Sequence, residues 1–327
     1  MKILIDIMGA DRAPIELLSG ALRAASALQT PDTRIEIVCN EPMIRKEARE
    51  SGLDLSGISI RHAPDVISMS DPPLAVVGEK KQSSMAVGLR ALAGGEADAF
   101  VSSGNTGALI TGGTLIVRRI KGIKRAAIGA ILPLANPVLL LDAGANLELT
   151  PEQMRQLAYL GSHYMSSLYG IELPRVGQIN NGAEPTKGRA LQIETYRLLS
   201  ESEELCFVGN IEPKDLPFGA CDVLLADGFT GNILLKYSEG IGRFLTDSIK
   251  GALFSVRSDA GCRRLLPLLK RFDAAEHGGA PILGLKKPII KAHGSSDGHA
   301  IFNAVRQAVR FVETLRFSAT AHDLTSD

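Results

Sequence analysis

The chain has 327 residues, which is enough for one large α/β domain or for two domains of average size. Its 36 Lys and Arg residues balance 36 Asp and Glu residues. This neutral charge argues against a globally basic nucleic-acid-binding protein and against an acidic disordered chain. Glycine is abundant, at 33 residues, whereas aromatic residues make up 5% and tryptophan is absent. Glycine-built loops are therefore the first places to look for function.

The cysteines and the apolar segments indicate the compartment. The four cysteines form no C-x-x-C pair, so we expect reduced thiols and neither a zinc site nor a disulfide framework; they are Cys39, Cys206, Cys221 and Cys262. Residues 1–7 are apolar but contain Asp6 and lack a cleavage-site pattern, which favours a first strand over a signal peptide. The longest apolar region, 126–141, is interrupted by prolines and is too short to span a bilayer. We expect a cytoplasmic protein.

Taken in chain order, short β-branched runs alternate with helical patterns. The runs predict buried strands over 2–7, 34–38, 99–102, 127–132, 138–142, 175–179, 205–208 and 222–226. Helical periodicity predicts helices over 15–28, 76–93, 151–168 and 188–199, and Thr150 before Pro151 is typical of a helix start. This alternation predicts an α/β fold with a largely parallel sheet. No linker or low-complexity tract divides the chain, so we expect a single catalytic domain over residues 1–327.

Four predicted strands run directly into loops rich in glycine, asparagine and threonine, at 103–108, 142–146, 180–188 and 227–232. Ligands of open parallel sheets bind at such carboxyl ends of strands. Glycine lets backbone N–H groups approach an anion, and the helix that follows adds its partial positive charge. The loops therefore predict a site for phosphate or a phosphorylated ligand. The alternative is that they are only tight turns whose Asn and Thr side chains cap helices.

Other short motifs narrow the function. No G-x-G-x-x-G follows the first strand and no Walker-type loop occurs, so a nicotinamide dehydrogenase is a weak alternative. Residues 294–298 match G-x-S-x-G between a strand-like and a helix-like segment. This match makes Ser296 the candidate nucleophile of a serine thioesterase. In that hydrolase pattern the acid and the histidine follow the serine at some distance, and only a short segment with His299, His322 and Asp323 remains here.

Seven ordered motifs together closely resemble the PlsX family of phosphate acyltransferases over nearly the whole chain. They are DIMGAD from Asp6, SGNTGA from Ser103, LDAGAN from Leu141, EPTKG from Glu184, DGFTGN from Asp227, GGAPILG from Gly278 and HGSSD from His293. Two positions depart from the family pattern: Ala10 replaces a second glycine, and Asn181 stands where isoleucine is expected. Both departures are mild and leave the chemistry plausible.

The resemblance implies a reaction in which acyl-[acyl carrier protein] and inorganic phosphate give acyl phosphate and free carrier protein for phospholipid synthesis. It implies a Rossmann-like αβα sandwich with a largely parallel sheet, similar to the fold of phosphate acetyltransferases and isopropylmalate-type dehydrogenases. It calls for no cofactor and no metal. It also implies a homodimer, and a downstream glycerol-3-phosphate acyltransferase that uses the acyl phosphate. Phosphate is already anionic near neutral pH, so the reaction demands positioning and charge neutralisation more than a strong base. This explains why no catalytic triad stands out.

Within these motifs the expected catalytic residues are Lys187 for phosphate, His293 for proton handling at the leaving thiolate, and Asn232 as an oxyanion donor. The expected phosphate- and substrate-binding residues are Gly104, Asn105, Thr106, Gly107, Asn146, Asn180, Gly228, Thr230, Gly231, Ser295 and Ser296. A simpler interpretation remains open for each of two residues. Lys187 could be a solvated lysine at a helix start, and His293 could be a structural histidine bonded to a backbone carbonyl.

We expect residues 238–275 to form a helical hairpin insertion, because their apolar residues recur at helical spacing. From Arg243 to Arg271 seven basic residues stand against two acidic ones, a local positive patch in a neutral chain. Such an element suits a dimer interface, an acidic carrier protein or an anionic membrane. In PlsX-like proteins such helices mediate dimerisation and peripheral membrane contact, so the resemblance implies that Leu253, Phe254 and Val256 touch lipid. The local charge predicts that Arg263 and Arg264 bind carrier protein or vesicles. A plain dimer-forming hairpin with a solvated face is the alternative.

Two further functions stay open beside the thioesterase. A phosphate acetyltransferase acting on acetyl-coenzyme A would share the fold and the nucleophile. A non-catalytic adaptor would bind carrier protein or membrane through the basic hairpin and would be indifferent to changes in the glycine loops. The acyl-chain length is recorded by no motif.

Overall fold

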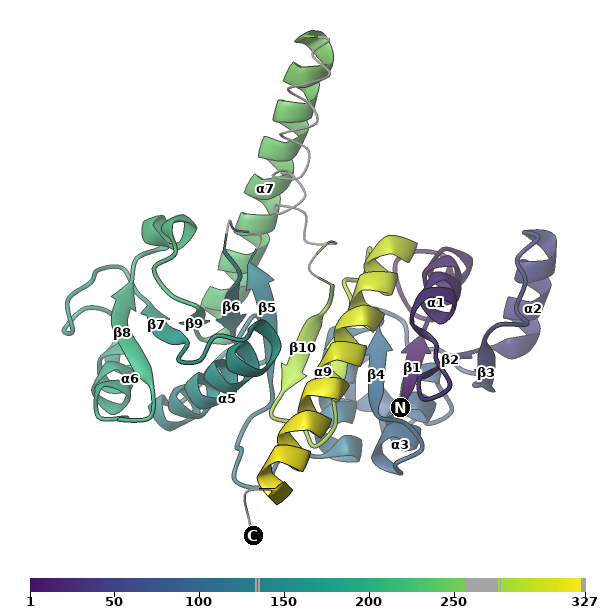
Figure 1. Ribbon diagram of the computed structural model, residues 1–327, viewed down its shortest axis with the longest axis horizontal. Helices are drawn as coiled ribbons and strands as arrows, with labels where there is room; N and C mark the ends of the chain where they lie inside the picture. Colours follow the sequence, from purple (N-terminus) through teal and green to yellow (C-terminus); the bar gives the residue numbers. More distant parts are fainter. Residues whose placement is uncertain (133, 135, 257–275, 277, 325–327) are drawn as a thin grey trace. The chain divides into compact units, whose positions relative to one another are not determined.

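The computed structural model describes residues 1–132, 134, 136–256, 276 and 278–324 (Figure 1). Backbone contacts divide the chain into two compact units. Unit 1 comprises Met1–Ala126 and Gly278–Asp327, and unit 2 comprises Ala127–His277. The expectation of one catalytic domain with a hairpin at 238–275 stays a prediction.

Unit 1 contains a mostly parallel sheet in the order β3-β2-β1-β4-β11-β10. Its parallel strands are β1 (Lys2–Asp6), β2 (Arg34–Cys39), β3 (Ser59–His62), β4 (Ala99–Ser102) and β11 (Ile289–Lys291). Strand β10 (Ala280–Leu283) runs antiparallel to β11. Because β1, β4 and β11 are parallel neighbours, the loops that follow them meet at one edge of the sheet.

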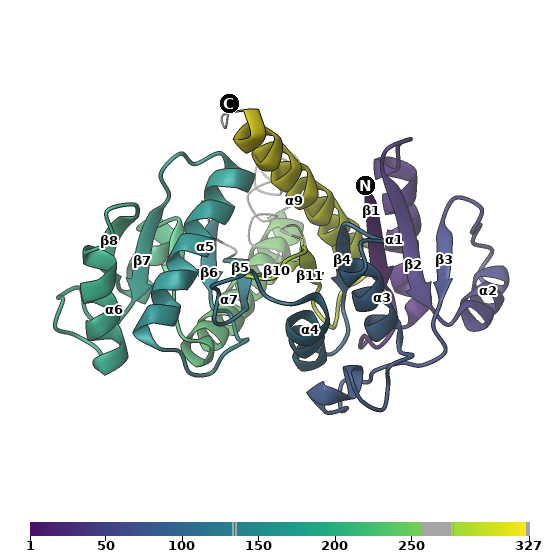
Figure 2. The ribbon, with the colours of Figure 1, turned by 90° about the horizontal axis from the view of Figure 1, so that it is seen from below.

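Helices cover both faces of this sheet. Helices α1 (Pro14–Leu28) and α9 (Gly298–Leu324) pack against each other on one face, and α3 (Ser84–Ala93) lies on the other (Figure 2). Helix α2 (Glu41–Glu50) packs near β3. Helix α4 (Thr106–Gly112) continues into a π-helical turn, η2 (Gly113–Val117), and the 3-10 turn η1 (Pro73–Val76) contacts α4. These helices place the loop after β4 at the start of α4.

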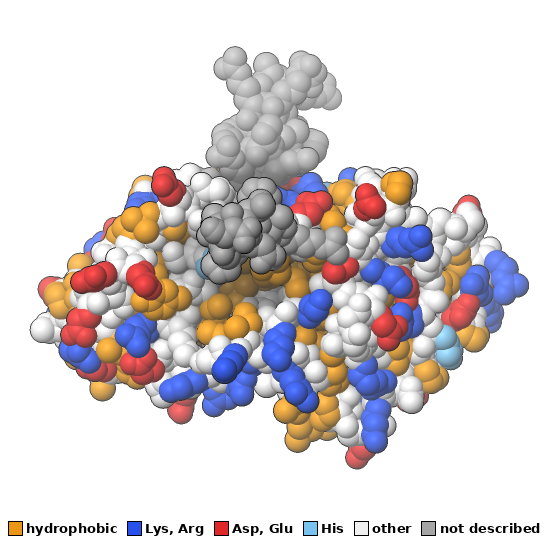
Figure 3. Space-filling view, turned by 60° about the horizontal axis from the view of Figure 1, so that its bottom comes forward, with side chains coloured by type: hydrophobic (Ala, Val, Ile, Leu, Met, Phe, Trp, Pro, Cys, Tyr) orange, Lys and Arg blue, Asp and Glu red, His pale blue; other side chains and the backbone are white. Residues whose placement is uncertain are grey.

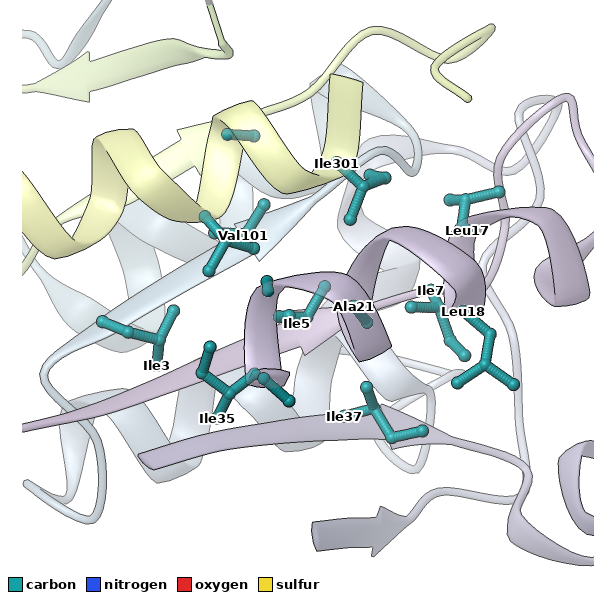
Figure 4. Close-up of a cluster of buried hydrophobic side chains, with 14 of the residues drawn as sticks. Ile3, Ile5, Ile7, Leu17, Leu18, Ala21, Ile35, Ile37, Val101 and Ile301 are labelled. Carbon is teal, nitrogen blue, oxygen red and sulfur yellow. The ribbon is translucent and has the colours of Figure 1, made fainter. Parts of the chain in front are cut away.

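The core of unit 1 is aliphatic. Figure 4 shows side chains of β1, β2, α1 and α9 meeting there, among them Ile5, Ile37, Leu17 and Ile301, which are all fully buried. The pairing of α1 with α9 depends on a glycine, because a Cβ at Gly20 would lie 2.1 Å from a backbone carbonyl oxygen of α9. This close packing fixes the start of α9, where the HGSSD motif ends.

Unit 2 has a sheet in the order β5-β6-β9-β7-β8. The strands are β5 (Ala127–Leu132), β6 (Val138–Leu141), β7 (Arg175–Ile179), β8 (Cys206–Ile211) and β9 (Val223–Leu225), all parallel except for the β5–β6 hairpin. Helices α5 (Pro151–Tyr169) and α6 (Ala190–Ser200) pack together, α5 against the central strands and α6 against β8, and the 3-10 segment η3 (Pro213–Phe218) precedes β9. Helix α7 (Gly228–Val256) contacts β5 and β6 at its start and extends well beyond these strands (Figure 1).

The predicted α/β fold with a largely parallel sheet is confirmed, and most strands lie where the sequence places them. The predicted helix over 76–93 is wrong in its first half, because the helix begins only at Ser84. Ser83 is its N-cap, and the Ser83 side chain accepts a hydrogen bond from the backbone N–H of Ala86. A serine at this position ends the preceding turn and starts the helix, which periodicity alone does not reveal.

The insertion also differs in its beginning. Helix α7 starts at Gly228, so the loop after β9 opens directly onto a helix of 29 residues. The second limb of the expected hairpin, residues 257–275, lies outside the described residues. Among the residues that the structure describes, no helix is both long and apolar enough to cross a membrane. In the same part of the chain, no three His, Cys, Asp or Glu side chains are grouped to hold a metal ion.

Candidate active site

In unit 1, a buried carboxylate begins the site at the end of β1. Asp6 is 1% exposed, and its carboxylate accepts hydrogen bonds from the Ser102 hydroxyl at 2.9 Å and from the backbone N–H of Met8 at 3.0 Å. The Ser102 hydroxyl oxygen in turn accepts from the backbone N–H of Gly104 at 3.1 Å. Burial raises the pKa of Asp6 to about 6. Asp6 therefore ties the loops that follow β1 and β4 to each other.

A buried lysine at the end of β11 is the main residue that sequence reasoning missed. The Lys291 ammonium donates to the carbonyl oxygens of Ser103, at 3.3 Å, and of Ala292. Burial lowers the pKa of Lys291 to about 8, against the opposing effects of Asp11 and Asp6. The signal was a lysine that closes an apolar strand next to the HGSSD motif. Its place in the structure links the loop after β4 to the loop after β11.

Asn105 is committed to the protein itself. Its side-chain oxygen accepts from the backbone N–H of Ala108 at 3.0 Å and so caps α4. Its amide nitrogen lies within 3.1–3.2 Å of the carbonyl oxygens of Ser68, Met69 and Asp71. The Asn105 side chain thus holds the 68–71 segment against the start of α4.

The neighbours of Asn105 in the SGNTGA loop differ in exposure. A Cβ at Gly104 would lie 2.9 Å from the Met85 side chain, and one at Gly107 would lie 2.9 Å from the Pro73 ring. Thr106, between them, is exposed. The two glycines therefore allow close packing of the loop, and Thr106 is the side chain of this loop that a ligand can reach.

The loop after β11 presents a histidine to solvent. The Nδ1 atom of His293 lies 2.8 Å from the Ser295 hydroxyl and accepts from the Ser295 backbone N–H at 3.2 Å. Because Nδ1 accepts a hydrogen bond, the neutral ring carries its proton on Nε2. Ser296 is buried, and its backbone N–H donates to the His293 carbonyl. Within the described residues, no hydrogen bond joins the Ser296 hydroxyl to a histidine, which leaves the thioesterase hypothesis without the base it requires.

In unit 2, one buried carboxylate organises the loop after β6. Asp142 accepts from the backbone N–H groups of Ile128, Gly144, Ala145 and Asn146, and from the Asn146 side-chain amide. The distances run from 2.7 to 3.2 Å. Burial raises the pKa of Asp142, and these donors oppose the rise. The Asp142 side chain in the LDAGAN motif therefore fixes the shape of this loop, and Asn146 is one of its hydrogen-bond partners.

A second carboxylate, Asp227, caps α7. It accepts from the Thr230 backbone N–H at 2.8 Å and from the Thr230 hydroxyl at 3.1 Å, and it forms an ion pair with Arg189 at 2.8 Å. The Asp227 side chain is 5% exposed and that of Arg189 is 71% exposed. The Thr230 hydroxyl is thus already engaged as a donor inside the loop.

The first turn of α7 lies directly against the loop after β6. A Cβ at Gly228 would lie 2.4 Å from the Asn146 carbonyl oxygen, and one at Gly231 would lie 1.9 Å from the Asp142 carbonyl oxygen. Only glycine permits these approaches. Asn232 lies against the same loop. The two motifs therefore form a single surface at the edge of this sheet.

The loop after β7 contributes an unpaired cation. The Asn180 side chain donates to the Lys187 carbonyl oxygen at 3.0 Å and accepts from the Asn181 backbone N–H at 2.8 Å. The Asn210 amide donates to the Glu184 carbonyl oxygen at 2.8 Å. Lys187 is exposed, and within the described residues its ammonium forms neither an ion pair nor a hydrogen bond. The loop backbone is thus held in place while its cation remains available to an anion.

The predicted site residues therefore fall into two clusters. Unit 1 holds Gly104, Asn105, Thr106, Gly107, His293, Ser295 and Ser296, and unit 2 holds Asn146, Asn180, Lys187, Gly228, Thr230, Gly231 and Asn232. The three proposed lipid contacts, Leu253, Phe254 and Val256, belong to the end of α7. Arg263 and Arg264 lie outside the described residues. The unit 1 residues come from the two loops after β4 and β11, and the unit 2 residues come from the three loops after β6, β7 and β9.

Solved structures define the class of fold. The chain is similar to a phosphotransacetylase from Streptococcus pyogenes, with a TM-score of 0.63 and 16% identity over 97% of this chain and 94% of that one. It is also similar to the EutD phosphotransacetylase from Staphylococcus aureus, with a TM-score of 0.59, 16% identity and the same coverage. The fold is therefore that of the phosphotransacetylases, as the sequence predicts.

Sequence comparison narrows this class to a family. The family model described as "Fatty acid synthesis protein" matches residues 1–317. The chain is 42% identical to the phosphate acyltransferase of Caldanaerobacter subterraneus subsp. tengcongensis, and the match covers 100% of this chain and 99% of the relative. It is 43% identical to that of Anoxybacillus flavithermus, over 95% of each chain. The chain belongs to the PlsX family of phosphate acyltransferases, and it is an acyltransferase enzyme of lipid biosynthesis.

Proposed function

We propose that this protein transfers a long-chain acyl group from acyl carrier protein to inorganic phosphate and so produces acyl phosphate for phospholipid synthesis. Family membership supports the reaction. The structural observation that carries it is Lys187, an exposed cation without an ion partner in the described structure, on a loop whose backbone is fixed by Asn180 and Asn210. A fixed cation beside glycine-rich strand-end loops suits a small anionic nucleophile.

The bonds of this reaction balance without a covalent enzyme intermediate. A phosphate oxygen attacks the thioester carbonyl carbon, a C–O bond forms and the C–S bond breaks. The thiolate leaves and takes up one proton, while hydrogenphosphate loses one in becoming acyl phosphate. The protein's task is to orient phosphate, to stabilise the developing oxyanion and to move one proton.

We assign the proton transfer to His293. Its Nδ1 atom faces Ser295, so Nε2 is the atom that donates a proton to the leaving thiolate when the ring is in its imidazolium form. The proton that hydrogenphosphate loses then restores the imidazolium. Thr106 and Asn232, together with nearby backbone N–H groups, are the proposed donors to the oxyanion or to phosphate. The carboxylates Asp6 and Asp142 position these loops and do not touch substrate.

The test measures release of carrier-protein thiol from a long-chain acyl carrier protein with and without phosphate, while hydroxylamine traps acyl phosphate. We expect thiol release to depend on phosphate. Lys187→Ala should raise the KM for phosphate about tenfold or more, because one charge-assisted contact contributes about 1.5–3 kcal/mol. The matched control is Lys214→Ala in the same unit, because the Lys214 ammonium is paired with Glu212.

The outcomes separate the candidate functions. Thiol release without phosphate would favour the thioesterase. A preference for acetyl-coenzyme A over long-chain acyl carrier protein would favour a phosphate acetyltransferase. His293→Gln should lower kcat and leave the KM for phosphate nearly unchanged, and an unchanged kcat would make His293 structural.

We also propose that α7 mediates homodimer formation and peripheral contact with an anionic membrane. The exposed side chains of Ile233, Tyr237, Ile241 and Phe244 recur at three- and four-residue spacing and form an apolar stripe on this helix. A cytoplasmic enzyme held at a membrane would deliver acyl phosphate to a glycerol-3-phosphate acyltransferase there. Analytical ultracentrifugation and co-sedimentation with phosphatidylglycerol vesicles test the two contacts, with Tyr237→Asp as the dimer variant and Phe254→Asp as the lipid variant.

A further inference from the structure

Two segments of unit 1 lie side by side and concentrate positive charge. The Ile120 backbone N–H donates to the Gly284 carbonyl at 2.9 Å, and the Lys286 backbone N–H donates to the Arg118 carbonyl at 3.0 Å. A β-bridge joins Arg119 to the same segment. The residues that make up this basic surface are Arg118, Arg119, Lys121, Lys124, Arg125, Lys286 and Lys287.

Much of the charge of the basic surface is not paired with acidic side chains in the described structure. Residues 114–127 and 278–296 contain no Asp or Glu. In the described part of the chain, no ion pair is formed by Arg118, Lys121, Arg125, Lys286 or Lys287. Figure 3 shows Lys and Arg side chains gathered on the face that this view brings forward. Such a concentration in a neutral chain attracts an acidic partner.

The backbone at the centre of the basic surface is strained. Arg118 has φ 73° and ψ 158°, a region that is essentially restricted to glycine, and it is the single non-glycine residue with positive φ in the described structure. This conformation costs about 1–3 kcal/mol, and glycine at this position would avoid the cost. This backbone outlier lies where the two segments meet and motivates the hypothesis that the Arg118 side chain serves a function. Hydrogen bonds to Gly113 and Lys286 hold it in place.

The basic surface also has an apolar component. Leu115 is 53% exposed and Ile120 is 44% exposed, each within three residues of Arg118. A surface that combines a few apolar side chains with several cations matches a folded protein surface with acidic and apolar residues. The rigid backbone favours such a shaped partner over a fluid lipid surface, which needs no fixed geometry.

The basic surface lies at the amino ends of β4 and β11, at the edge of the unit 1 sheet opposite the strand-end loops, because α4 and η2 run back along the sheet from the SGNTGA loop. This position suits only a partner that carries its substrate on a long flexible arm. Helix α4 and the turn η2 form one continuous helical run, Thr106–Val117, from the SGNTGA loop to Arg118. At about 1.5 Å per residue, this run places the basic surface about 18 Å from the loop. A partner docked there delivers a thioester to the loop only through an extended prosthetic arm.

We propose that the basic surface formed by residues 118–125 and 284–287 is the docking site for the acidic acyl carrier protein that donates the acyl group. This inference rests on the proposed function and deepens it. It assigns donor recognition to described residues of unit 1, separate from the basic hairpin that the sequence suggested.

The test compares two double charge reversals. Arg125→Glu with Lys286→Glu changes the basic surface, and Lys46→Glu with Arg49→Glu makes the same change in net charge on the exposed face of α2. We expect the first variant to raise the KM for acyl carrier protein about tenfold, because two attractive contacts become repulsive. The effect should largely vanish in about 1 M salt, where the Debye length falls to about 3 Å. The KM for acyl-pantetheine, which lacks the protein, should not change.

Three results would overturn the proposal. One is an equal KM for acyl carrier protein in both variants. Another is an equal rise in the KM for acyl-pantetheine, which would indicate a damaged active site. The third is loss of binding to phosphatidylglycerol vesicles with an unchanged KM for the carrier protein, which would assign the surface to membrane. If the wild-type protein makes no acyl phosphate, the proposed reaction fails, and fluorescence anisotropy of labelled carrier protein against the same variants still decides the docking site.

Discussion

Asp6 allows a quantitative prediction about how stability depends on pH. Its carboxyl is 1% exposed, and burial raises its pKa from 3.8 to about 6. A carboxyl whose pKa is higher in the folded than in the unfolded state favours folding while it is protonated. Its contribution is complete below pH 3.8 and is lost as the pH rises through about 6.

The magnitude follows from the two pKa values. At about 1.4 kcal/mol per tenfold change in proton affinity, the whole effect is about 3 kcal/mol. About 2 kcal/mol of it falls between about pH 4.5 and pH 7.5. The free energy of unfolding of the Asp6→Asn variant, minus that of the wild type, should therefore increase by about 2 kcal/mol over this range. Any constant loss from the altered hydrogen bond to Ser102 cancels in this comparison.

Urea unfolding followed by circular dichroism at several pH values gives the measurement. The control is Asp54→Asn, because Asp54 is exposed and its pKa is lowered by hydrogen bonds from Ser56. Its difference from the wild type should not increase with pH. A difference for Asp6→Asn that stays constant within about 0.5 kcal/mol would refute the reasoning, because it would mean that Asp6 ionises in the folded protein as readily as in the unfolded chain.

Two other predictions concern packing and thiol reactivity. Gly231→Ala should lower the free energy of unfolding by about 3 kcal/mol or more, because the new Cβ would lie 1.9 Å from a backbone carbonyl oxygen. The control is Gly240→Ala in the same helix, where the new Cβ meets nothing within 4 Å. In urea unfolding the control should be neutral or stabilising. Burial raises the pKa of Cys39 and of Cys221 to about 12, so neither thiol should react with a thiol reagent at neutral pH before the protein unfolds. The half-buried Cys206 should react in the native protein. Rapid labelling of Cys39 in the native protein would contradict this prediction.

Most of the fold was predictable because its signals are local. The β-branched runs at 99–102, 127–132 and 175–179 coincide with β4, β5 and β7. The Thr150–Pro151 pair marks the start of α5, where the Thr150 side chain and Gln153 form a capping box. The helix predicted over 76–93 failed because a serine cap competes with apolar periodicity, and periodicity does not record where a helix begins.

The positions of the loops that form the candidate site could be predicted from the sequence, but the roles of their side chains were less predictable. The motifs located the strand-end loops, but sequence did not show that Asn105 and Asp142 direct their hydrogen bonds inward. Lys291 was missed because burial of a lysine depends on tertiary packing. The basic surface was missed because its two segments are far apart in the chain, and the fold brings them together through the β-bridge at Arg119 and two backbone hydrogen bonds beside it.

The buried carboxylates at the strand ends explain how loops rich in negative charge can serve an anionic substrate. Asp142 has four backbone N–H donors and one side-chain amide donor around it, and Asp227 is matched by Thr230 and Arg189. Each charge is balanced locally by dipoles or a cation, so little of it acts on a ligand outside the loop. In the 180–188 loop the side chains of Glu184 and Lys187 are both exposed, and neither forms an ion pair in the described structure. The buried aspartates thus fix the geometry of the loops without presenting their charge to a ligand, and Lys187 is the cation that is left to meet phosphate.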